Sequence, residues 1–243
     1  MIPSFFSFTK VRVDTTLEID LHSHLIPGID DGAKDMQESL ALLTALENLG
    51  YKKVITTPHI MVDTYCNTRE IIEEGLHKLR VAAKNHHLTI AIDAAAEYYL
   101  DDGFFEQLKS GEVLTFGDNY LLFETSYMAK PLLFDKMIDK IITLGYKPVM
   151  AHPERYRYIE NMAMEYKAFK EKGMYFQVNI NSFGGHYAKD AKMKAEYLAK
   201  QGMIDFLGSD VHHMKQVTTL KKIMQKNTYK NIYKNNVILN RTL

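Results

Sequence analysis

The alternation of short apolar runs with amphipathic runs is the feature that most restricts what this chain can fold into. Runs rich in β-branched and aromatic residues predict strands, and runs with apolar residues at helical spacing predict helices between them. This alternation is typical of parallel strands joined by crossover helices. Seven strands in one series predict a closed or nearly closed α/β barrel. The strand-like runs cover residues 17–24, 53–60, 88–99, 119–126, 147–155, 174–182 and 204–213.

Local signals mark several helix ends. Thr68 is a suitable N-cap for a helix over 68–85, and the helix expected over 131–145 has proline at its start and glycine at its end. The lysine-rich stretch 214–236 predicts one closing helix with a solvated face. The glycine-rich loops of dinucleotide-binding folds and of phosphate-binding loops are absent from the sequence, so neither kind of nucleotide site is indicated.

The segment EIDLHSHLIPGIDDG, residues 18–32, places two histidines at the end of the first strand-like run. Residues i and i+2 of a strand point to the same side, so His22 and His24 can aim at one point. The following turn brings Asp30 and Asp31 close behind them. Two imidazoles and a carboxylate are a suitable ligand set for a divalent metal ion. The alternative is two strand-end histidines that make ordinary hydrogen bonds.

The other strand-like runs end in residues of the same kinds. In a parallel barrel all these ends lie on one face, where active sites form. A buried carboxylate is unfavourable unless it is paired or bound to a metal, so packing alone explains this distribution poorly. We therefore expect a polynuclear metal site built from several strands. The candidates after the first run are His59, Glu97, Glu124, His152, Asn179, Asn181, Ser182, Asp210 and His212.

Composition excludes several classes of protein. Lysine plus arginine and aspartate plus glutamate each number 30, and this balance argues against a protein whose main role is to bind nucleic acid. No stretch approaches the roughly 18 apolar residues of a membrane-spanning helix, so an integral membrane protein is not expected. A single cysteine, Cys66, and the lack of a recognisable secretion signal indicate the cytoplasm. Phe5, Phe6 and Phe8 are expected to form a terminal strand or a packing plug.

Six motifs, in order, resemble the polymerase-and-histidinol-phosphatase superfamily: DLHSHLIPGIDDG, TTPHI, AAAEYY, LFETS, AHPERY and GSDVHH. Together they are similar to the bacterial manganese-dependent protein-tyrosine phosphatases linked to capsule and exopolysaccharide synthesis. The resemblance implies a distorted seven-stranded, TIM-like (β/α)7 barrel, with residues 1–243 as a single metallophosphatase domain. Glu124 stands where the histidinol-phosphatase branch typically has histidine, which favours the tyrosine-phosphatase branch. Ile60 departs from the histidine or basic residue found there in many relatives.

The resemblance also implies how three metal ions would share their ligands. The first ion would be held by His22, His24, Glu97 and Asp210. The second would share Glu97 and also bind Glu124 and His152, and the third would bind Asp31, His59 and His212. Asp30 is the rival of Asp31, because adjacent residues face different ways. Arg155 matches a family arginine that contacts phosphate, so the residues expected in catalysis are Arg155, Glu97, His152 and Asp210.

The ligand chemistry suggests a mechanism. Imidazole and carboxylate ligands without thiolate suit manganese, with iron and zinc as alternatives. Clustered divalent ions lower the pKa of bound water and clamp phosphate oxygens, so we expect in-line attack of a metal-bound hydroxide on a phosphomonoester. A tyrosine leaving group, with a pKa of about 10, departs without strong protonation. A cysteine-based phosphatase is excluded, because no arginine follows Cys66 at the required spacing.

The resemblance implies that the substrate is the phosphotyrosine-bearing tail of a bacterial tyrosine kinase of polysaccharide synthesis. One alternative is a small-molecule phosphatase, such as a histidinol-phosphate phosphatase. A metal-dependent nuclease is a second alternative, against which the neutral net charge argues. A barrel that has lost its chemistry is a third, and the filled ligand positions argue against it.

Overall fold

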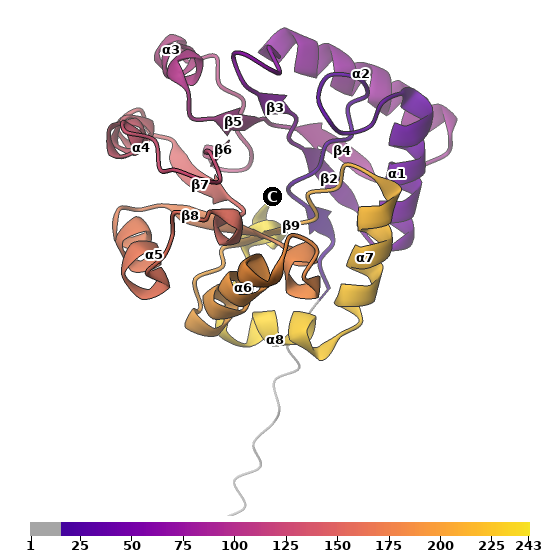
Figure 1. The fold of residues 1–243 in the computed structure, drawn as a ribbon. Helices are drawn as coiled ribbons and strands as arrows, with labels where there is room; N and C mark the ends of the chain where they lie inside the picture. Colours follow the sequence, from indigo (N-terminus) through magenta and orange to yellow (C-terminus); the bar gives the residue numbers. More distant parts are fainter. Residues whose placement is uncertain (1–15) are drawn as a thin grey trace, which may run out of the picture.

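The computed structural model describes residues 16–243, so the predicted role of Phe5, Phe6 and Phe8 lies outside the described residues. Strands and helices alternate along the chain, and the helices surround a central ring of strands (Figure 1). The strands are β1 (Ile19–Asp20), β2 (Lys53–Thr56), β3 (His59–Ile60), β4 (Ala91–Ala94), β5 (Glu97–Tyr99), β6 (Tyr120–Glu124), β7 (Lys147–Ala151), β8 (Tyr175–Asn179) and β9 (Phe206–Gly208). The α-helices are α1 (Met36–Asn48), α2 (Arg69–Asn85), α3 (Asp102–Ser110), α4 (Phe134–Thr143), α5 (Met162–Glu171), α6 (Lys189–Gln201), α7 (Met214–Met224) and α8 (Asn227–Asn235).

The named strands pair in parallel and form a curled sheet in two parts. One part has the strand order β1-β2-β4, and the other has the order β3-β5-β6-β7-β8-β9. Two of the predicted runs are split, because two residues separate β2 from β3 and β4 from β5. The described chain therefore has nine strands where seven were predicted. A parallel bridge between Ser23 and Val211 joins the first and last segments of the ring.

The helix signals were right in part. The Thr68 side chain accepts a hydrogen bond from the backbone of Ile71 and caps α2, as predicted. Helix α4 begins at Phe134 rather than at Pro131, because residues 131–133 form a turn without a side-chain cap. The single closing helix predicted over 214–236 is wrong: the backbone is extended at Lys226, and α7 and α8 are separate helices. Within residues 16–243, no helix has the length and apolar character that crossing a membrane requires.

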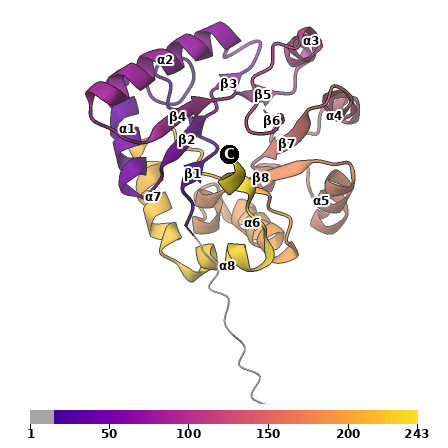
Figure 2. The same cartoon turned by 180° about the vertical axis from the view of Figure 1, so that it is seen from behind.

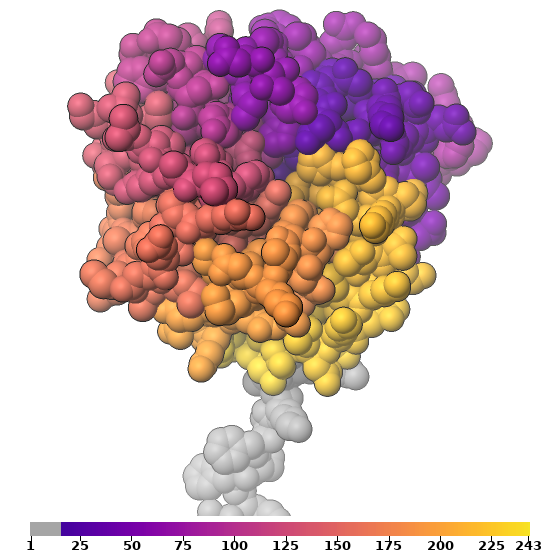
Figure 3. Space-filling view, viewed as in Figure 1, coloured from indigo at the N-terminus to yellow at the C-terminus, as the bar shows by residue number. Residues whose placement is uncertain are grey.

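Two apolar clusters hold the ring together. The larger one fills the space between the strands and the surrounding helices. The smaller one lies among the strands and includes Leu21, Leu122 and Phe206. Leu239 and Leu243 pack against this smaller cluster, and the C-terminus lies at the centre of the ring in the view from behind (Figure 2). Early and late parts of the described chain, indigo and yellow, lie side by side on the surface (Figure 3). The C-terminal segment thus packs against the inner cluster of the ring.

Asn240 ties the C-terminal 3-10 turn Leu239–Thr242 to two strands. Its buried side chain accepts from the backbone N–H of Leu207 at 2.9 Å and donates to the carbonyls of Leu207 at 2.8 Å and Ile19 at 3.0 Å. Replacing Asn240 with alanine leaves these backbone groups without partners. We expect the free energy of unfolding to fall by about 2–4 kcal/mol, since each unpaired buried group costs about 1–3 kcal/mol. Urea denaturation checks this, and a fall below about 0.5 kcal/mol would contradict it.

Candidate metal centre and active site

One cavity of about 230 Å³ is lined by residues that follow β1, β6, β7 and β9 and by the first residues of β3 and β5. All nine predicted ligand residues belong to four overlapping groups, in each of which the donor atoms lie within 4.8 Å of one another. The groups are His22, His24 and Asp210; His22, Glu97 and His152; His59, Glu97 and Glu124; and His24, Asp31, His59 and His212. The groups overlap more than the three ligand sets implied by the resemblance, because His22, His24 and His59, as well as Glu97, each belong to two of them.

His22 and His24 follow β1 on a segment that is bridged to Val211 through Ser23. Both side chains are fully buried and point to the same side, as the i, i+2 spacing predicted, with their Nε2 atoms 3.3 Å apart. The Nδ1 atom of His22 lies 2.7 Å from the Gln177 side-chain oxygen, and that of His24 lies 2.7 Å from Asp30 Oδ2. A metal ligand must be a neutral imidazole, and in the neutral form these acceptors would hold the proton on Nδ1 and leave the Nε2 lone pair of each ring for the metal.

Carboxylate oxygens face the same point. Glu97 Oε2 lies 3.1 Å from the Nε2 atom of His22 and 3.6 Å from that of His24. Asp210 Oδ1 lies 3.6 Å and 3.7 Å from the same two atoms. Four electron-pair donors that converge in a buried space repel one another unless a cation lies among them. The donor set therefore fits a divalent ion of the manganese, iron or zinc kind.

Glu97, at the start of β5, is the centre of the arrangement. Its second oxygen, Oε1, lies 2.9 Å from His152 Nε2, and its Oε2 lies 3.3 Å from His59 Nδ1. The same Nδ1 atom of His59 lies 3.1 Å from Glu124 Oε1 but outside hydrogen-bond geometry. His152 Nδ1 is likewise buried with no hydrogen-bond partner among the described residues. The parallel pairing of β3 with β5 sets His59 directly beside Glu97, and Glu124 ends β6 two residues beyond Leu122, the partner of Glu97.

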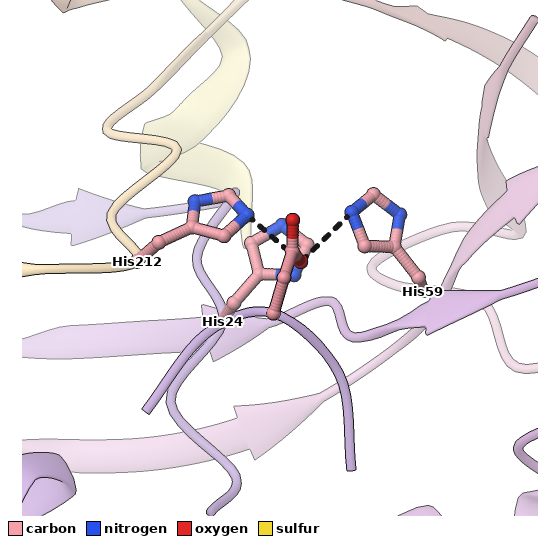
Figure 4. A group of neighbouring side chains, drawn as sticks. His24, His59 and His212 are labelled. Atoms are coloured by element: carbon pink, nitrogen blue, oxygen red, sulfur yellow. Dashed lines mark ion pairs between the residues drawn. The ribbon is translucent and has the colours of Figure 1, made fainter. Parts of the chain in front are cut away.

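Asp31 lies between two histidines at the mouth of the site. Its Oδ1 atom lies 3.4 Å from the Nε2 atoms of both His59 and His212, which approach it from opposite sides (Figure 4). Asp30 instead accepts from His24 Nδ1, from the backbone of His59 at 3.2 Å and from the backbone of Gly32 at 3.0 Å. The Asp30 carboxylate is therefore engaged in holding His24 and the loop, whereas Asp31 faces the cavity.

The electrostatic field of the cluster favours positive charge at its centre. Burial opposes charge on His22, but the carboxylates of Glu97 and Asp210 raise the pKa of its imidazole to about 9. Burial and the neighbouring His212 lower the pKa of His24 to about 4, in spite of its bond to Asp30. His24 is therefore neutral near pH 7, as a metal ligand must be.

The sequence matches the family described as capsular polysaccharide synthesis, CpsB/CapC, over residues 18–239. The chain belongs to the CpsB/CapC family. Tyrosine-protein phosphatase CpsB from Streptococcus pneumoniae is 30% identical over 202 residues, which cover 81% of this chain and 83% of that protein. Tyrosine-protein phosphatase YwqE from Bacillus subtilis is 29% identical over 81% of this chain and 78% of its own length.

Structural comparison agrees with the family match. A chain from the crystal structures of YwqE from Bacillus subtilis and CpsB from Streptococcus pneumoniae, described as unique metal-dependent tyrosine phosphatases, aligns with a TM-score of 0.74. The alignment has 25% identity and covers 90% of this chain and 96% of that one. The lactonase Lmo2620 from Listeria monocytogenes, with a TM-score of 0.51 and 12% identity, shares the fold alone. The predicted resemblance to the capsule-linked tyrosine phosphatases is confirmed, together with an α/β fold built on a curled parallel sheet.

This member of the CpsB/CapC family has two buried amide side chains beside the cluster, Gln177 and Asn179. Gln177 accepts from His22 and from the backbone of His152 at 3.3 Å, and it donates to Asn179 at 2.9 Å. Asn179 in turn donates to Asp210 Oδ2 at 2.6 Å. Asn179 was among the candidates, but Gln177 was not. Their i, i+2 spacing on β8 puts both on one face, and this signal could have identified Gln177.

Other candidates have structural roles in this CpsB/CapC protein. Ser182 donates to the buried carboxylate of Glu154 at 2.6 Å, and the Asn181 side chain donates to the backbone of Ser209 at 3.4 Å. Cys66 is exposed and is not among the residues that line the cavity. The histidines expected at the surface are exposed, as predicted: His77, His86 and His87.

Proposed function

We propose that this chain is a metal-dependent protein-tyrosine phosphatase whose reaction takes place in the cavity at the strand ends. One observation carries the proposal: two imidazole Nε2 atoms, from His22 and His24, and two carboxylate oxygens converge on one point. The cavity that adjoins this cluster is also lined by Arg155. The relatives CpsB and YwqE are tyrosine-protein phosphatases, which supports phosphotyrosine as the substrate residue.

We assign the metal-holding role to nine residues and favour manganese, with about three ions per site. Bound divalent ions would lower the pKa of a water molecule and offset the charge of the phosphate. Within the chain, Asp30 and Gln177 orient the rings of His24 and His22 through their Nδ1 atoms. Asp31 is the aspartate we favour over Asp30. The nine residues are His22, His24, Asp31, His59, Glu97, Glu124, His152, Asp210 and His212.

Arg155 is the group that we assign to the phosphate. It lies on the 3-10 turn Pro153–Arg155 directly after His152, and its Nη1 atom is 3.2 Å from Asp210 Oδ2. A guanidinium presents a planar fork of donors that matches two phosphate oxygens. The leaving tyrosine oxygen has a pKa of about 10 and needs little protonation, so the proposal assigns no general acid.

The wider setting is also part of the proposal. The substrate would be the phosphotyrosine-bearing tail of a tyrosine kinase that acts in capsule synthesis, and the reaction would take place in the cytoplasm. We regard the fold as a distorted seven-stranded barrel, since joining β2 with β3 and β4 with β5 leaves seven runs, and we regard residues 1–243 as one domain. A small-molecule phosphatase that acts on an ester such as histidinol phosphate is the competing function.

The first test is metal removal. Chelation should abolish hydrolysis of a phosphotyrosine peptide, and added Mn²⁺ should restore it, because the converging donors need a cation. A His152→Ala variant should remain inactive after Mn²⁺ is added, because it lacks the imidazole whose Nε2 atom lies 2.9 Å from Glu97 Oε1 in the wild type. The matched control is His77→Ala, which removes an exposed imidazole on α2. Phosphate release is measured for the peptide and for histidinol phosphate in parallel.

Hydrolysis of the peptide that survives complete chelation would contradict the metal-dependent mechanism. Faster turnover of histidinol phosphate than of the peptide would favour the competing function instead. If neither ester is hydrolysed while manganese is bound at the site, the proposal of a phosphatase acting on these substrates is wrong.

A further inference from the structure

We propose that Tyr187 is a positioning residue for this reaction. It holds the guanidinium of Arg155 and the Oδ2 atom of Asp210 in place for phosphate binding. The inference rests on the proposed function, because it assigns Arg155 to the phosphate. Tyr187 lies in the loop between the 3-10 turn Ile180–Gly184 and helix α6, and it lines the cavity. The sequence interpretation did not identify it.

Two tyrosine rings contact the Arg155 guanidinium. Its central carbon lies 4.3 Å from the centre of the Tyr187 ring and 4.5 Å from that of the Tyr127 ring. The Arg155 side chain is 22% exposed, so part of it still reaches solvent. Cation–π contacts are stronger for a partly desolvated cation, and two of them restrict the orientation of the planar group. A fixed plane is what the two-point binding of a phosphate requires.

Tyr187 and Tyr127 connect Arg155 to two different proposed metal ligands. The Tyr187 hydroxyl donates to Asp210 Oδ2 at 2.8 Å, and the Tyr127 hydroxyl donates to Glu124 Oε2 at 3.4 Å. Each tyrosine therefore contacts the arginine through its ring and a proposed metal ligand through its hydroxyl. The Tyr187 bond is the shorter of the two, so Tyr187 is expected to have the larger effect.

Asp210 uses its two oxygens differently. Its Oδ1 atom faces His22, His24 and His212, the last through Nδ1 at 3.5 Å. Its Oδ2 atom accepts from Tyr187, from Asn179 at 2.6 Å and from Arg155 at 3.2 Å. When Arg155 turns its donors toward a phosphate, Tyr187 and Asn179 still satisfy Oδ2. Tyr187 thus allows Arg155 to bind substrate without leaving a buried carboxylate oxygen short of partners.

The loop that carries Tyr187 has an unusual backbone. Gly185 has φ of 78° and Ala188 has φ of 117°, and the second value is unfavourable for a residue with a side chain. A backbone hydrogen bond of 3.3 Å from His186 to Asn181 helps to hold the loop. The positive φ of Gly185 suits a glycine, whereas that of Ala188 is adopted in the same loop whose Tyr187 contacts Arg155 and Asp210.

The test compares Tyr187→Phe and Tyr187→Leu in the manganese-loaded protein. The leucine variant loses both the ring and the hydroxyl, and the phenylalanine variant loses only the hydroxyl. Binding of inorganic phosphate is measured by calorimetry, manganese content by elemental analysis, and kcat and KM on a phosphotyrosine peptide. The matched control is Tyr197→Phe, on α6 and outside the residues that line the cavity.

We expect Tyr187→Leu to weaken phosphate binding by about tenfold or more and to lower kcat/KM by a similar factor. We expect Tyr187→Phe to fall between this variant and the wild type, and all three proteins to hold the same amount of manganese. Phosphate binding by the leucine variant within about twofold of the wild type would overturn the inference, and so would loss of manganese from either variant. If the wild type binds phosphate but does not hydrolyse the peptide, the proposed function fails, and phosphate binding alone still decides the role of Tyr187.

Discussion

Replacing Glu97 with glutamine is expected to lower kcat/KM for a phosphotyrosine peptide by at least about 100-fold and to lower the bound manganese. The Glu97 oxygens lie 3.1 Å from His22, 3.3 Å from His59 and 2.9 Å from His152. Glutamine keeps the size of the side chain, but it removes the negative charge and turns an N–H group toward imidazole nitrogens. Activity and metal content are measured on the same preparations.

Glu73→Gln is the matched control for this variant, because Glu73 is an exposed glutamate on α2 with 55% of its side chain accessible. The control should retain the activity and metal content of the wild type. A Glu97→Gln protein with full manganese and nearly normal activity would show that Glu97 does not bridge two ions, and the proposed sharing of ligands would have to be abandoned.

Replacing Arg155 with methionine is expected to lower kcat/KM by about 100- to 1000-fold while the manganese content stays unchanged. The reason is that Arg155 is assigned to the phosphate rather than to a metal ion. Lysine at this position retains the charge but loses the planar fork, so Arg155→Lys should recover only part of the activity. Steady-state kinetics and elemental analysis of both variants check this.

Arg157→Met serves as the control, since Arg157 is two residues further along the chain, exposed and outside the cavity lining. Activity of the methionine and lysine variants of Arg155 equal to that of the wild type would mean that neither the fork nor the charge contributes. A loss of manganese from Arg155→Met would instead assign Arg155 to the support of Asp210, whose Oδ2 atom lies 3.2 Å from its Nη1 atom.

Much of the arrangement could be predicted because its signals are local. The i, i+2 spacing of His22 and His24 requires only an extended backbone, and their Nε2 atoms lie 3.3 Å apart. Thr68 caps α2 through its own side chain, which is a contact between near neighbours in sequence. The convergence of the strand ends follows from the parallel alternation, which is also a repeated local pattern.

Other features depend on contacts between distant residues and gave weak signals. The break between α7 and α8 has no proline or glycine at Gln225 or Lys226, so helical spacing extended the predicted helix through it. The breaks that split two of the predicted strands occur where the chain passes from one part of the sheet to the other. Tyr187 gave no signal, because its partners Arg155 and Asp210 lie 32 and 23 residues away in the sequence.

The sequence by itself determined the order of strands and helices, the family, and which imidazoles and carboxylates occur at the strand ends. The tertiary structure alone decided how these groups face one another: Asp30 binds His24 while Asp31 faces the cavity, and the Gln177 oxygen lies 2.7 Å from His22 Nδ1. The physical reason is that strand and helix periodicity arises from near neighbours. The direction of a side chain in a buried polar cluster is set by partners that only folding brings within hydrogen-bond distance.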